Sequence, residues 1–102
     1  MIRLTCTLTT EGRPFVRIAA AGWYFLFAID LAAGEPVGAT ELRRAVTGHA
    51  FWPEALPVVG DDVALAIARR GVLGEYRVDL KADRSFVIVT APTTGDVIGG
   101  AP

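Results

Sequence analysis

Residues 23–31 read Trp-Tyr-Phe-Leu-Phe-Ala-Ile-Asp-Leu and form the most hydrophobic segment of this 102-residue chain. In a strand, successive side chains point to opposite faces. One face then holds Trp23, Phe25, Phe27, Ile29 and Leu31, and the other holds Tyr24, Leu26, Ala28 and Asp30. A helix through the segment would be apolar all round, whereas its aromatic density favours a strand. Because both faces are apolar as far as Asp30, we expect a strand that is covered on both sides.

The chain before this segment predicts a hairpin. Residues 2–9 alternate between apolar side chains, including Cys6, and polar ones, which is typical of a half-buried strand. Residues 10–14 contain Gly12 and Pro14 and predict a turn. Residues 15–20 then predict the second strand. The alternation points Cys6 inward, where a thiol behaves as a small apolar side chain.

The middle of the chain contains weaker signals. Thr40 is a suitable N-cap for a short helix over residues 41–46, which Gly48 would end. Residues 48–60 combine aromatic side chains with prolines and predict an irregular loop. Asp61 or Asp62 can cap a helix over residues 63–70, with two arginines at its C-terminal end. Residues 63–68 also alternate in a way that fits a strand, so the sequence leaves both alternatives open.

The end of the chain predicts a second hairpin. Residues 76–81 and 86–90 have strand patterns, and residues 82–85 provide the turn. Residues 93–102 are rich in Gly, Thr and Pro, so we expect a flexible tail after a single domain over residues 1–92. The predicted fold is α+β, a mostly antiparallel sheet of about five strands with one or two short helices.

Composition narrows the classes of function. The net charge is −1, whereas nucleic-acid binders normally have a basic excess, so we expect no nucleic-acid partner. The longest apolar stretch, residues 18–29, is shorter than the ~20 residues that span a bilayer, so we expect a soluble protein. A single cysteine excludes an intrachain disulfide. These features fit a cytoplasmic or virion-associated protein.

The residues that usually carry catalysis are few. The chain has one histidine, His49, one cysteine, one lysine, Lys81, and one serine, Ser85, which lies in a predicted turn. No second histidine or cysteine accompanies His49, so the sequence predicts no metal site and no cofactor. The glycines form no phosphate-binding motif. The pairs Arg43-Arg44 and Arg69-Arg70 are explained as charges at helix C-termini. We therefore expect a protein that is not an enzyme.

The apolar content, 52% of residues, exceeds what a small sheet with short helices can cover. The sequence therefore favours a structural or interaction subunit that forms a homo-oligomer or joins a larger assembly, such as a phage virion. The candidate interaction surface is Tyr24, Leu26, Phe51 and Trp52; tryptophan in loops is enriched at interfaces.

Two other functions remain open at this point. The first is a small-molecule-binding or enzymatic domain with a pocket formed by His49, Trp52, Asp61 and Asp62, which are close in the sequence. The second is a small inhibitor or regulator that docks on a larger enzyme.

Overall fold

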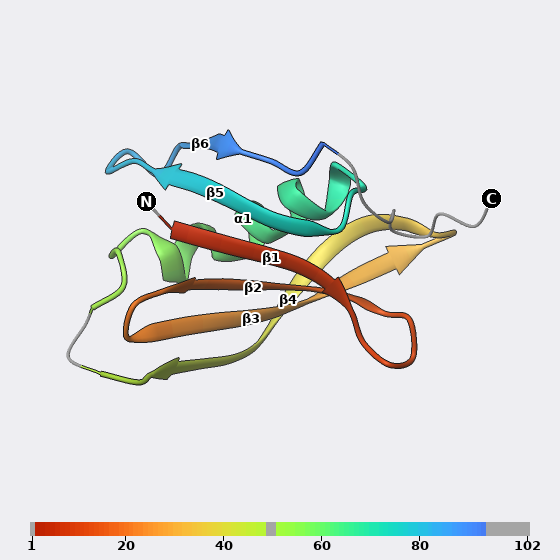
Figure 1. Ribbon diagram of the computed structural model, residues 1–102, viewed down its shortest axis with the longest axis horizontal. Coiled ribbons are helices and arrows are strands. Elements are labelled where there is room, and N and C mark those ends of the chain that lie inside the picture. Colours follow the sequence, from red (N-terminus) through yellow and green to blue (C-terminus); the bar gives the residue numbers. More distant parts are fainter. Residues whose placement is uncertain (1, 49–50, 94–102) are drawn as a thin grey trace.

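The chain folds into one antiparallel sheet with a helix packed on one side (Figure 1). The structure, a computed structural model, describes residues 2–48 and 51–93. The elements are β1 (Ile2–Leu8), β2 (Pro14–Ala20), β3 (Trp23–Ala32), β4 (Glu35–Val46), α1 (Leu56–Arg69), β5 (Gly74–Leu80) and β6 (Phe86–Thr90). The six strands have the order β4-β3-β2-β1-β5-β6. The predicted α+β fold with a mostly antiparallel sheet is confirmed.

The N-terminal strand β1 lies inside the sheet, between β2 and the C-terminal hairpin. β1 pairs with β2 on one side, where Cys6 lies opposite Val16. On its other side β1 pairs with β5, where Leu4 lies opposite Tyr76. The N-terminal strand therefore brings the final hairpin, β5 and β6, next to the first one.

The core lies between one face of the sheet and α1. Each central strand contributes every second residue to it, as the alternation in the sequence predicts. The fully buried side chains include Leu4, Cys6, Val16, Ile18, Phe25, Leu56, Val63, Ile67, Tyr76 and Val78. The Tyr76 hydroxyl donates a hydrogen bond to the Val72 carbonyl oxygen at 2.5 Å, which satisfies its polar group beside the core.

Residues 41–46 belong to strand β4, so the prediction of a helix capped by Thr40 was wrong. β4 pairs with β3 along its length, from Ala32 opposite Glu35 to Trp23 opposite Val46. Two register shifts, at Leu26/Phe27 and Asp30/Leu31, interrupt the simple alternation that identifies a strand. Pairing with the long strand β3 thus overrides a weak local helix signal. Arg43 and Arg44 consequently lie on a strand and not at a helix end.

Residues 63–70 lie in α1 up to its C-cap at Arg70, which decides between helix and strand. The helix begins at Leu56, earlier than predicted, so the loop prediction for residues 56–60 and the capping role of Asp61 or Asp62 were wrong. Pro57 occupies the first turn, where its missing N–H is not needed. Arg69 lies in the last turn, as predicted. The predicted tail over residues 93–102 lies almost entirely outside the described residues.

Phe25 lies at the centre of the core, as its position in the segment 23–31 predicts. Its ring centroid is 5.8 Å from that of Trp23 and 5.1 Å from that of Trp52, both edge to face. We expect Phe25→Ala to lower the free energy of unfolding by about 3–5 kcal/mol, as truncation of buried aromatic residues does. The matched control is Phe51→Ala, because Phe51 is 94% exposed and should change stability by less than about 0.5 kcal/mol. Urea denaturation checks both values, and similar losses in the two variants would contradict this arrangement.

Gly60 permits close contact between α1 and β3. A Cβ atom at this position would lie 2.8 Å from Cζ of the buried Phe27 ring. Gly→Ala in a helix normally gains up to about 1 kcal/mol, whereas overpacking a core costs about 1–3 kcal/mol. We expect Gly60→Ala to be destabilising, and less so when combined with Phe27→Leu. Denaturant melts of the single and double variants test this, and a stabilised Gly60→Ala protein would contradict the close contact.

Candidate functional site

The sheet has a second face, opposite α1, that no described element covers. We call it the open face and define it by the outward side chains of five strands. These are Arg3, Thr5, Thr7, Phe15, Arg17, Ala19, Tyr24, Leu26, Ala28, Arg43, Glu75 and Arg77. They alternate along each strand with the residues that face the core. The expectation that β3 is covered on both faces is therefore met only on the α1 side, within the part of the chain that the structure describes.

Three arginines gather at one end of the open face. Arg3 lies directly opposite Arg77 on β5, and Arg17 on β2 lies opposite Thr5, two residues further along β1 than Arg3. Together with Ala19 and the β2–β3 turn they line a hollow of about 450 Å³, which we call the arginine hollow. Glu75 contacts two of them, at 3.2 Å from Arg3 Nε and 3.7 Å from Arg77 Nη2. The single negative charge of Glu75 is thus shared by two guanidinium groups. The three arginines of the hollow therefore carry more positive charge than this carboxylate neutralises.

Tyr24 lies beside the arginine hollow and is engaged by two arginines. The guanidinium carbon of Arg17 is 5.0 Å from the centroid of the Tyr24 ring, and that of Arg43 is 6.0 Å away. Both distances fit cation–π contacts. These contacts hold the two guanidinium groups over β3, and they explain why the Tyr24 ring is half-buried although no described element covers it.

The other end of the open face is apolar. Phe15, Leu26, Ala28 and Leu42 line a hollow of about 380 Å³, which we call the apolar hollow. Leu42 reaches it because of the register shift in β4, where Arg43 pairs with Leu26 and Glu41 pairs with Phe27. Leu42 is 59% exposed, although it belongs to a strand. Thr9, Arg13 and Asp30 form a polar rim, and Asp30 accepts a hydrogen bond from Thr40 Oγ1 at 3.0 Å.

The predicted interaction residues are divided between the two sides of the sheet. Tyr24 and Leu26 lie on the open face. Trp52 is half-buried on the α1 side, where it packs on Phe25 and its ring lies 5.7 Å from the Arg44 guanidinium carbon. Phe51 precedes it and is almost fully exposed. The structure therefore does not join these four residues into one surface. Trp52 instead packs against the hydrophobic core.

The predicted pocket formed by His49, Trp52, Asp61 and Asp62 stays a prediction, because one of its residues is not described. His49 lies outside the described residues. Asp61 and Asp62 are exposed on α1, and Asp61 Oδ1 accepts a hydrogen bond from the backbone N–H of Asp62 at 2.9 Å. The arginine hollow and the apolar hollow are lined by other residues. No cluster of three or more potential metal ligands occurs within residues 2–48 and 51–93.

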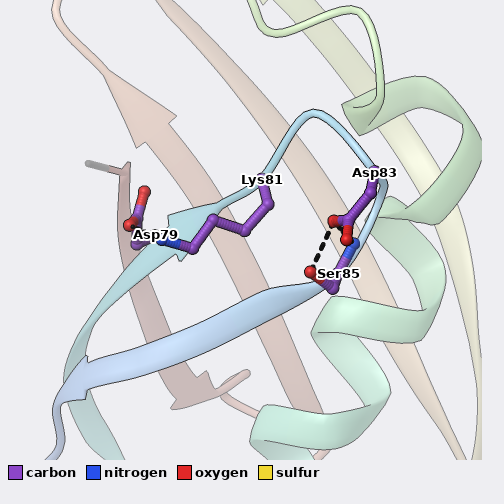
Figure 2. A network of polar contacts seen from close by, with 4 residues as sticks. All are labelled: Asp79, Lys81, Asp83 and Ser85. Carbon is purple, nitrogen blue, oxygen red and sulfur yellow. Dashed lines mark hydrogen bonds and ion pairs between the residues drawn. The ribbon is translucent and has the colours of Figure 1, made fainter.

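Ser85 lies in the β5–β6 turn, as predicted, in a local network of polar contacts (Figure 2). Its hydroxyl donates a hydrogen bond to Asp83 Oδ1 at 2.5 Å, and its backbone N–H donates to the same oxygen at 3.0 Å. These bonds lower the pKa of the Asp83 carboxyl. Lys81 Nζ similarly contacts Asp79 at 2.8 Å and lowers the pKa of that carboxyl. These contacts are those of a well-formed turn, in which the Asp83 carboxylate accepts two hydrogen bonds from Ser85.

The arginine hollow is the feature that sequence reasoning missed. Arg3, Arg17 and Arg77 each occupy a polar position of a predicted strand, so their outward direction was predictable. Their proximity depends on the order of the strands, which places β1 between β2 and β5. The alternation within a single strand contains no information on that order.

Comparisons of the chain with protein-family models, with curated proteins and with solved structures found no match. Among the described residues, no helix is both long and apolar enough to cross a lipid bilayer.

Cys6 is fully buried, as predicted, and burial raises the pKa of its thiol from 9.0 to about 11. We expect the native protein to resist iodoacetamide at pH 8, because the thiolate is the reactive form, whereas the urea-unfolded chain reacts. The raised pKa favours the folded state below pH 9, and this advantage is lost as the pH rises towards 11. Cys6→Ala should lose less stability than the wild type over that interval. Fast labelling of the folded protein would contradict the buried position.

Proposed function

We propose that this chain is a non-enzymatic interaction subunit that docks on a protein partner through the open face of its sheet. The observation that carries the proposal is the uncovered apolar part of that face, where Leu26 and Ala28 of β3 lie beside Phe15 of β2. Contiguous apolar surface that is rimmed by polar residues usually marks an association site.

The distribution of side chains on the two faces supports this proposal. β3 places aromatic residues towards α1 and places Tyr24, Leu26 and Ala28 on the open face. A sheet face that only meets water is normally polar at such central positions. Arg17 and Arg43, which lie opposite Leu26 on the two neighbouring strands, add charged groups that can fix the orientation of a partner.

The reactive side chains support a non-enzymatic function. Cys6 is buried with a raised pKa, which suppresses the thiolate. The Ser85 hydroxyl donates a hydrogen bond to Asp83 in a surface turn. Neither residue lines the arginine hollow or the apolar hollow, where a substrate would have room to bind.

An assembly subunit, in a homo-oligomer or in a particle such as a virion, would use the open face for a permanent contact. An inhibitor or regulator of a larger enzyme would use the same face for a reversible one. Both are interaction functions, and both require that Leu26 becomes buried against another chain.

Leu26→Glu tests the proposal. The new carboxylate lies opposite Arg17 and Arg43, so the domain should remain folded while the apolar contact is lost. The matched control is Val58→Glu, because Val58 is an exposed valine of α1. Circular dichroism checks folding, light scattering measures mass, and affinity capture from the native source measures partner binding.

We expect the wild type and Val58→Glu to form a complex, with themselves or with another protein, that Leu26→Glu does not form. A wild-type chain that is monomeric at high micromolar concentration, and that captures the same proteins as Leu26→Glu, would refute docking through the open face.

A further inference from the structure

We propose that the partner of the open face is an acidic protein segment with an apolar side chain close to its carboxylates. This inference rests on the proposed function and specifies its ligand. Two hollows of different chemistry lie on the same face, and they meet where Arg17 of β2 lies directly opposite Leu26 of β3. A single short segment that crosses this boundary contacts both.

The arginine hollow determines the charge of the ligand. Arg3 and Arg77 share the carboxylate of Glu75, and no described carboxylate lies within 4 Å of the Arg17 guanidinium nitrogens. The whole chain has a net charge of −1, so the positive excess is local to this region. Guanidinium groups bind carboxylates through paired, directional hydrogen bonds, and an acidic segment supplies such carboxylates.

The apolar hollow determines the second feature of the ligand. Phe15, Leu26 and Leu42 present apolar surface next to the positive charge, and a side chain such as leucine would bury it. Arg3 and Arg77 lie two and three strands away from Leu26 and are offset from it by two residues in register, so with strands about 4.8 Å apart the distances are about 12–16 Å. At about 3.3 Å per residue, an extended segment spans this distance in about three to five residues. The carboxylates should therefore follow or precede the apolar side chain at that spacing.

Charge and geometry favour this ligand over a nucleic acid. Arg17 and Arg43 already contact the Tyr24 ring, which is therefore not a free platform for a base. The apolar hollow also has no counterpart in a phosphate backbone.

The same features disfavour a second copy of the chain. Two open faces packed against each other would bring together two surfaces that each have more guanidinium groups than Glu75 can neutralise. Such a contact leaves charges buried without partners, which is unfavourable. An acidic segment instead supplies the missing carboxylates.

Fluorescence anisotropy with synthetic peptides tests this inference. The probe is a labelled peptide in which glutamates flank leucines at the expected spacing, and its two controls replace the glutamates with glutamine or the leucines with serine. We expect the probe to bind about tenfold more tightly than either control, with an affinity that falls as salt is added. Arg17→Gln should weaken binding by a similar factor. Arg84→Gln, which removes an arginine from the β5–β6 turn, should leave it unchanged.

Three outcomes would overturn the inference. The first is equal binding of the probe and the glutamine control. The second is tighter binding of single-stranded oligothymidine or of phosphatidylserine vesicles than of the probe. The third is a wild-type homo-oligomer that Leu26→Glu dissociates, because it would place a second copy on the open face. If the probe fails while Leu26→Glu still abolishes a complex, the proposed docking function stands and only the acidic ligand is refuted.

Discussion

The packing of the aromatic row of β3 against α1 is the constraint on which the rest of the structure depends. Phe25 and Phe27 stack with their ring centroids 6.4 Å apart, and Trp23 meets Phe25 edge to face. Gly60 lets the helix backbone lie directly on the Phe27 ring. Because these rings are large, their burial supplies much of the hydrophobic stabilisation available to a domain of this size.

One helix can cover only one face of the sheet, and this has consequences for the other face. The strand that provides the aromatic row also carries Tyr24, Leu26 and Ala28 on its opposite side. With α1 placed on the core side, the only cover that residues 2–48 and 51–93 give these side chains comes from their neighbours on the sheet. Arg17 and Arg43 provide part of it by lying over the Tyr24 ring. Because side chains alternate between the two faces of β3, the same strand forms both the core and the open face.

Sequence patterns identified the strands whose alternation is clean. Residues 86–90 were predicted with the bounds of β6, and residues 2–9 and 15–20 with nearly those of β1 and β2. β4 was missed because its two register shifts break the period of two. The start of α1 was missed because Asp61 and Asp62 are typical capping residues, whereas Ala55 at the actual N-cap makes no side-chain capping bond.

The sequence by itself determined which side chains share a face within each strand, since this follows from the alternation of the backbone. It therefore placed Cys6 and Phe25 in the core and Tyr24 and Leu26 on the opposite side. Only the tertiary structure decided which strands are neighbours and which face receives the helix. The arginine hollow depends on the first decision, because Arg3, Arg17 and Arg77 are far apart in the chain and meet only where β1 lies between β2 and β5. The open face depends on the second, because burial against α1 is a contact between distant segments that no local pattern encodes.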